Sequence, residues 1–194
     1  LGDDRLVLYA PTWRDGDEDP AIPTAADWVR ITAVLDEHDA RLIVRPHPLG
    51  AGEYAPPSGA ERVHLLGSEV LADVTPVLAG MDLLVTDYSS LAYDSSLVPL
   101  PVVYFAPDVD DYARRRGFYG TYADVAGTDV AADWEAALAQ IAAVLSDDDV
   151  RRARLESARR LDAVMHAHRD GRNAERVYRA IMAAIGDDSR EETA

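Results

Sequence analysis

The sequence contains no cysteine and no lysine, and it has no long apolar run. Without cysteine the chain has no disulfide, no thiolate metal site and no cysteine nucleophile, as we expect of a cytosolic protein. No stretch reaches the length of a membrane-spanning helix, and we see no signal-peptide pattern. Because lysine is missing, every fixed cation is an arginine, which is suited to bidentate contact with phosphate.

Acidic side chains outnumber basic ones by 35 to 19, so the formal net charge is −16. A chain of this charge repels nucleic acid and anionic lipid overall, and we therefore predict no nucleic-acid partner. The 194 residues, of which 48% are hydrophobic, are sufficient for one domain with a substantial core.

Short apolar segments alternate with segments of helical spacing along the chain. This alternation predicts the α/β class, with a Rossmann-like, doubly wound parallel sheet followed by C-terminal helices. We expect strands at residues 5–10, 42–44, 63–66, 83–87 and 101–105, and a weak edge strand at 128–130. We expect helices at 25–35, 76–81, 91–97, 108–116, 130–145, 147–165 and 173–185, and leave 117–130 otherwise unassigned.

The chain is organised around the fourth of these strands, which ends in Asp87-Tyr88-Ser89-Ser90 with Asp94 one helical turn further on. Ligands of open α/β sheets bind beyond the carboxyl ends of the strands. Two hydroxyls beside the free N–H groups of a helix start suit a phosphate. The plainer interpretation is a capped helix start, and the two are compatible because a capping serine also binds phosphate.

A histidine lies between two prolines after the second strand, in Arg45-Pro46-His47-Pro48. The prolines restrict the backbone on both sides of His47, and Arg45 adds a cation beside it. We favour a functional histidine here over one that merely completes a turn. The other four histidines fall in helical or strand patterns, and we interpret them as structural or surface residues.

Two further segments carry candidate anion ligands. Thr12 and Arg14 follow the first strand, and Arg116 ends a run of three arginines before Gly117. Taken alone, the first segment is a turn with a surface arginine. The second is a helix end, where cations and glycine are favoured.

Several common sites are missing from the sequence. It has neither the Gly-x-Gly-x-x-Gly pattern of dinucleotide-binding folds nor the phosphate-binding loop of nucleoside triphosphatases. No metal-ligand cluster stands out, so we predict no metal site and no cofactor, and leave a magnesium requirement open.

Four motifs in order carry a family resemblance: 9–14 (Tyr-Ala-Pro-Thr-Trp-Arg), 45–48 (Arg-Pro-His-Pro), 85–90 (Val-Thr-Asp-Tyr-Ser-Ser) and 116–119 (Arg-Gly-Phe-Tyr). Together with residues 170–177 they resemble the CDP-glycerol glycerophosphotransferase family, the teichoic acid primases and polymerases. The resemblance implies that residues 1–186 are the C-terminal, donor-binding half of a GT-B fold, followed by a polar tail at 187–194. We expect the chain, which enters its first strand almost at once, to be a fragment that is inactive without an N-terminal GT-B domain.

The resemblance also implies a reaction and its participants. Glycerol phosphate would pass from CDP-glycerol, the CDP-activated polyol, to a hydroxyl of a lipid-linked polyol-phosphate acceptor, and CMP would leave. The full-length protein would lie in the cytoplasm, peripherally at the inner face of the cell membrane. The implied catalytic residues are His47 and Asp87, with Asp87 orienting the loop or contacting the polyol rather than acting as a base. The implied substrate-binding residues are Thr12, Arg14, Arg45, Pro48, Ser89, Ser90, Asp94 and Arg116.

Two alternatives remain at this point. One is a GT-B glycosyltransferase or epimerase domain that uses a UDP- or GDP-sugar. The other is a non-catalytic nucleotide-binding module of a larger protein.

Overall fold

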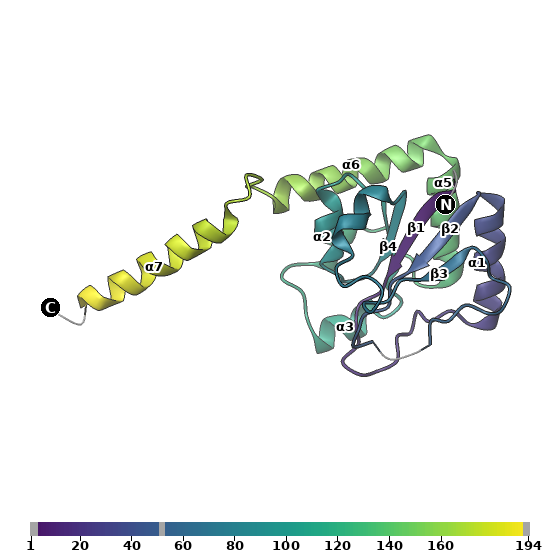
Figure 1. Ribbon diagram of the computed structural model, residues 1–194, viewed down its shortest axis with the longest axis horizontal. Helices are drawn as coiled ribbons and strands as arrows, with labels where there is room; N and C mark the ends of the chain where they lie inside the picture. Colours follow the sequence, from purple (N-terminus) through teal and green to yellow (C-terminus); the bar gives the residue numbers. More distant parts are fainter. Residues whose placement is uncertain (1–3, 51–52, 192–194) are drawn as a thin grey trace. The chain divides into compact units, whose positions relative to one another are not determined.

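Strand β1 (Arg5–Ala10) lies at the centre of a five-stranded parallel sheet of order β3-β2-β1-β4-β5 in the computed structural model, which describes residues 4–50 and 53–191 (Figure 1). The other strands are β2 (Ala40–Val44), β3 (Val63–Leu65), β4 (Leu83–Thr86) and β5 (Val102–Tyr104). All neighbouring pairs are parallel, and Tyr9 is level with both Val44 and Val85. The carboxyl ends of the three central strands therefore meet at one edge.

Alternate residues of β1 enter two separate cores, one on each face of the sheet. Val7 and Tyr9 pack with α1 (Ala25–Glu37) and α5 (Trp134–Ser146). Leu8 and Ala10 pack with the 3₁₀ helix η1 (Thr75–Gly80) and with α2 (Leu91–Ser96). This burial on both faces explains why the strands are continuously apolar, and it confirms the doubly wound fold.

Local signals position the helices around the sheet. Thr24 caps α1 in a capping box with Asp27, as its sequence position predicts. Thr121 and Asp124 form the same box on α4 (Tyr122–Ala126), a short helix in the segment that sequence analysis left unassigned. Helix α3 (Val109–Arg115) ends just before Gly117, whose positive φ of 71° suits glycine.

The five main strands are confirmed, but the weak strand predicted at 128–130 is wrong. None of these three residues is in a strand, and the next residue, Ala131, forms a single parallel bridge with Phe105 beyond the end of β5. The two-residue contact is too short for a periodic pattern to reveal it.

The chain divides into two compact units, residues 1–162 and residues 163–194. Helix α6 (Asp148–Met165) crosses the boundary, and α7 (Asn173–Glu191) forms most of the second unit. Helix α7 continues beyond Ile185, where we expected it to end, and residues 192–194 of the expected tail lie outside the described residues. In the described part of the chain no helix is both long enough and apolar enough to cross a bilayer.

Asp170 organises the approach to α7. Its carboxylate contacts both terminal nitrogens of Arg176 at 2.6 and 2.7 Å and accepts from the Arg172 N–H at 3.2 Å. The Arg176 hydrogen bonds lower the pKa of Asp170 from 3.8 to about 2. A lowered pKa stabilises the folded form above pH 3.8, and this stabilisation is lost as the pH falls toward 2.

We expect the Asp170 carboxyl carbon to titrate near pH 2 by NMR in this chain. In Arg176→Met its titration should move up toward the ordinary aspartate value, because the guanidinium that favours the carboxylate is gone. Asp124, whose pKa is lowered by its hydrogen bonds with Thr121, serves as the internal control, and its titration should be the same in both proteins. Equal titration of Asp170 in both proteins would contradict this assignment.

Candidate functional site at the switch point of the sheet

The chain runs from β1 to β2 and β3 on one side, then returns to β4 and β5 on the other. The carboxyl ends of β1 and β4 therefore border the topological switch point, where ligands of open α/β sheets bind. Asp87, just after β4, accepts from the Thr12 N–H at 2.9 Å and from the Thr12 hydroxyl at 2.5 Å. It also accepts from the Tyr88 N–H at 2.6 Å. Asp87 thus ties the two loops together, in keeping with an orienting role.

Arg14 lies inside this edge rather than on the surface, with 6% of its side chain exposed. Its guanidinium contacts Asp87 at 2.8 Å and makes a two-pronged pair with Asp108 at 2.8 and 3.1 Å. It also donates to the Thr12 carbonyl at 2.5 Å. Arg14 therefore joins the ends of β1, β4 and β5, and two carboxylates already occupy the donors that we predicted would bind phosphate.

A third carboxylate, Asp19, lies 3.9 Å from Arg14 and is also buried. Burial raises the pKa of Asp19, although hydrogen bonds from the Tyr54 hydroxyl and the Ala21 N–H act in the opposite direction. One buried cation thus faces three acidic groups, and this excess of negative charge makes Arg14 essential to the cluster.

Aromatic rings form the wall next to Arg14. Tyr88 and Tyr112 stack with ring centroids 3.9 Å apart, and the Arg14 guanidinium carbon lies 5.0 Å from the first ring and 5.5 Å from the second. Phe118 packs against both rings, and the Tyr88 hydroxyl donates to Asp108 at 2.8 Å. The rings exclude water from the ion pairs and so strengthen them.

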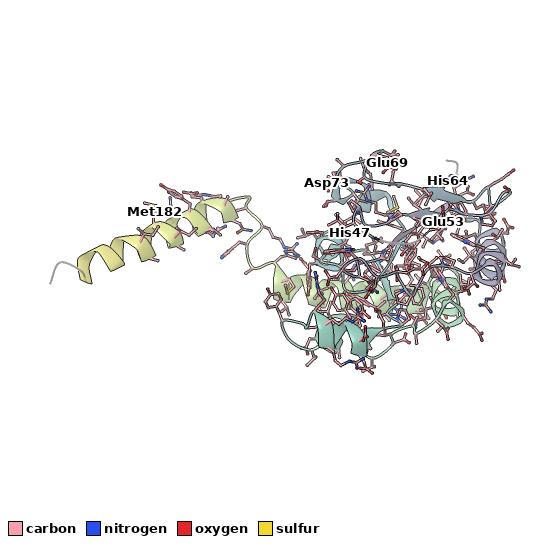
Figure 2. The ribbon with its side chains drawn as sticks, turned by 90° about the horizontal axis from the view of Figure 1, so that it is seen from below. His47, Glu53, His64, Glu69, Asp73 and Met182 are labelled. Atoms are coloured by element: carbon pink, nitrogen blue, oxygen red, sulfur yellow. The ribbon has the colours of Figure 1, made fainter. Side chains whose placement is uncertain are left out.

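His47 is exposed on the segment after β2 (Figure 2). Its Nδ1 accepts from the Leu49 N–H at 3.1 Å, so the neutral ring carries its proton on Nε2. In the described part of the chain, no protein group hydrogen-bonds to Nε2. The Gly50 N–H donates to the His47 carbonyl at 2.8 Å and closes the turn through Pro48. The turn therefore leaves the Nε2–H of His47 available as a hydrogen-bond donor at the carboxyl edge of the sheet.

Arg45, beside this histidine, is directed elsewhere. It is buried and donates to the carbonyls of Leu66 at 2.9 Å, Leu71 at 2.6 Å and Ala72 at 3.2 Å. These bonds hold the loop after β3 against β2. Its contact with a ligand phosphate stays a prediction.

The two serines at the start of α2 remain available to a ligand. Ser89 is half-buried and its hydroxyl accepts from the Leu91 N–H at 3.2 Å, whereas the Ser90 hydroxyl is exposed and makes no cap bond. Asp94 is half-buried on the first turn of the same helix. Since α2 has only six residues, its dipole is small. The hydroxyls of the two serines are therefore the main groups that could bind an anion at this helix start.

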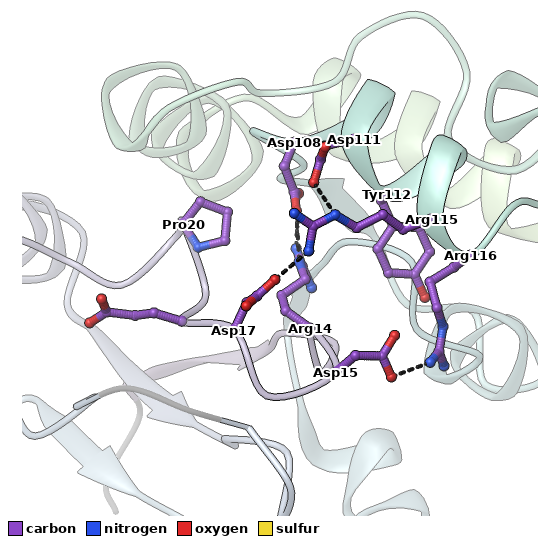
Figure 3. Close-up of a pocket in the computed structure, with 10 residues that line it drawn as sticks. Arg14, Asp15, Asp17, Pro20, Asp108, Asp111, Tyr112, Arg115 and Arg116 are labelled. Carbon is purple, nitrogen blue, oxygen red and sulfur yellow. Dashed lines mark hydrogen bonds and ion pairs between the residues drawn. The ribbon is translucent and has the colours of Figure 1, made fainter.

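A cavity of about 350 Å³ opens between the loop after β1 and helix α3 (Figure 3). Of the predicted site residues only Arg14 and Arg116 line it. Arg116 pairs with Asp15, and Arg115 pairs with Asp17 and Asp111. The cavity is therefore lined by guanidiniums that already have acidic partners, and it is distinct from the His47 and serine positions. The full lining is Arg14, Asp15, Asp17, Glu18, Pro20, Asp108, Asp111, Tyr112, Arg115 and Arg116.

Sequence reasoning missed Asp108, the residue that joins Arg14 to Tyr88. It stands directly after Ala106-Pro107 at the end of β5, and an acid between a strand end and a helix is the signal that would have found it. No cluster of His, Cys, Asp and Glu among the described residues has the geometry of a metal site.

Residues 1–183 match the family model of CDP-Glycerol:Poly(glycerophosphate) glycerophosphotransferase. The chain belongs to this family. Among curated relatives, the teichoic acid ribitol-phosphate primase of Bacillus spizizenii (strain ATCC 23059 / NRRL B-14472 / W23) is 27% identical over 182 residues. That alignment covers 93% of this chain and 44% of the primase.

The teichoic acid poly(glycerol phosphate) polymerase of Bacillus subtilis (strain 168) is 31% identical over 126 residues, covering 60% of this chain and 16% of the polymerase. Among solved structures, the wall teichoic acid polymerase TagF superposes with a TM-score of 0.70 at 22% identity, covering 97% of this chain and 45% of that one. The S. aureus MnaA–UDP complex superposes with a TM-score of 0.61 at 13% identity, covering 95% and 47%. These superpositions confirm the GT-B-type fold. The chain spans less than half the length of this primase and of these polymerases.

Proposed function

We propose that this chain is the donor-binding domain of a transferase that moves polyol phosphate from a CDP-activated polyol to a hydroxyl of a teichoic-acid-type acceptor. The observation that carries the proposal is the match to the family model over residues 1–183. The hydrogen bond between Thr12 after β1 and Asp87 after β4, at the switch point, supports it. A TagF variant soaked with CDPG has the same fold, with a TM-score of 0.68 over 97% of this chain, which is in keeping with this choice of donor.

The diphosphate of the donor would lie between the serines of α2 and the Nε2–H of His47. The acceptor oxygen attacks the β-phosphorus and loses its proton, while the bond from that phosphorus to the CMP oxygen breaks and CMP leaves with the electron pair. Catalysis of this kind is mainly positioning and charge stabilisation. His47 would donate to a phosphate oxygen as its charge develops, and Asp87 would keep the loops in place.

The proposal includes the remaining partners, by analogy with the family. A second GT-B domain would supply the acceptor side and a base, so we expect the chain by itself to bind donor without turning it over. The acceptor is lipid-linked, and the whole enzyme would act in the cytoplasm at the inner face of the membrane.

The first experiment is calorimetric titration of this chain with CDP-glycerol, CMP and UDP-N-acetylglucosamine. We expect the cytidine ligands to bind and the UDP-sugar not to bind. Ser89→Ala/Ser90→Ala should weaken cytidine-ligand binding by about tenfold or more, because hydrogen bonds to a charged phosphate are lost.

The matched control is Ser157→Ala, because Ser157 is an exposed serine on α6 that donates to its own helix at Ala153. Its affinity for CDP-glycerol should equal that of the wild type. A preference for the UDP-sugar would favour the glycosyltransferase or epimerase alternative, and unchanged affinity in the double variant would remove the serines from the site.

A further inference from the structure

Trp13 contacts two candidate site residues that come from different elements. Its ring lies parallel to the His47 imidazole, with an angle of 12° between the planes and 6.1 Å between the centroids. The Arg116 guanidinium carbon lies 5.4 Å from the centre of the same indole ring. Trp13 thus connects the segment after β2 to the end of α3.

No hydrogen bond of its own holds the indole ring in this position. Its Nε1 is buried and has no hydrogen-bond partner within residues 4–50 and 53–191. The neighbouring residues are held by other groups: the Thr12 N–H donates to Asp87, and the Arg14 guanidinium pairs with Asp87 and Asp108. The orientation of the ring therefore depends on packing, and His47 and Arg116 are two of the groups that pack against it.

His47 depends on this ring in return. Its side chain is exposed, and the turn that carries it is held by one bond to Nδ1 and one to the carbonyl. The Nδ1 bond sets the tautomer and restricts rotation of the imidazole from one edge, and the parallel indole ring adds a packing surface on its face. The Arg116 guanidinium is a cation, and cations are attracted to the face of an indole.

We propose that Trp13 is a positioning residue. By packing against both His47 and Arg116, it holds the His47 imidazole, and with it the Nε2–H donor, in a fixed orientation. The functional part of this inference rests on the proposed transferase function, whereas the stack itself does not. A diphosphate that reaches the serines of α2 would then meet an N–H donor that is already oriented. Binding would not have to order the exposed His47 side chain, so it would lose less conformational entropy.

NMR of this chain tests the stack directly. Trp13→Leu should move the His47 ring-proton resonances toward those of the exposed His168, because the ring current of the indole is removed. Trp13→Tyr keeps an aromatic face and should retain part of the displacement. The reciprocal variant, His47→Gln, should move the Trp13 indole N–H signal and leave those of Trp28 and Trp134, which lie in the core, unchanged. Unmoved His47 resonances in a folded Trp13→Leu protein would overturn the proposal.

Kinetics of a transferase that includes this chain test the consequence. Trp13→Leu should lower kcat by about 10- to 100-fold while the KM for CDP-glycerol changes little, because a misplaced donor group costs rate more than binding. Trp13→Tyr should recover much of the loss. An unchanged kcat would overturn the positioning role even if the NMR stack is present. Absence of any transfer by the parent enzyme is a failure of the proposed function, and the NMR result then decides the stack alone.

Discussion

Arg14→Met should lower the free energy of unfolding by about 3–5 kcal/mol, the usual cost of removing one partner from a buried ion pair. Methionine leaves Asp87 and Asp108 without their shared cation, next to a third buried acid, Asp19. It also removes the guanidinium from the faces of Tyr88 and Tyr112. Urea unfolding monitored by circular dichroism measures the change.

The matched control is Arg30→Met, because Arg30 also pairs with an aspartate but half of its side chain is exposed. We expect this variant to lose no more than about 1 kcal/mol, as exposed pairs do. Arg14→Lys should fall between the two, since lysine keeps the charge but lacks the planar fork that bridges two carboxylates. A loss below about 1 kcal/mol for Arg14→Met would mean that the cluster contributes little to stability, since exposed pairs cost no more than that.

His47→Ala should lower kcat of a transferase that includes this chain by at least about 100- to 1,000-fold, the range seen when one preorganised donor to a developing charge is removed. The reason is structural: the Leu49 N–H occupies Nδ1, so the neutral imidazole offers its proton from Nε2. Steady-state assay of CMP release, with CDP-glycerol and a polyol-phosphate acceptor, measures the effect.

The affinity for CDP-glycerol should change much less than kcat, because the donor acts on charge that appears in the transition state. His168→Ala is the matched control, since His168 is an exposed histidine of the second unit, and it should retain full activity. Retained turnover in His47→Ala would exclude a catalytic role for this histidine.

Much of the candidate site can be predicted from the sequence, because its residues directly follow the apolar runs that predict strands. Asp87, Ser89 and Ser90 stand directly after one apolar run, and His47 stands between two prolines after another. In a parallel sheet all such positions fall at the same edge, so proximity along the sheet follows from the pattern alone. The link between Asp87 and Thr12, 75 residues apart, is the outcome of this rule.

The sequence by itself determined the class of fold and the order of the motifs, because hydrophobic period and strand-end chemistry are local properties of the chain. The family came from the resemblance of those motifs to known proteins. Only the tertiary structure decided which partner each arginine takes. Arg45 bonds to carbonyls of the loop after β3 and Arg14 to carboxylates from two other strand ends, while Arg116 lies over Trp13. A guanidinium on a long side chain can donate hydrogen bonds to a phosphate of a ligand, to a carboxylate or to a backbone carbonyl. The choice is made by the groups that folding brings within reach, from segments far apart in the chain.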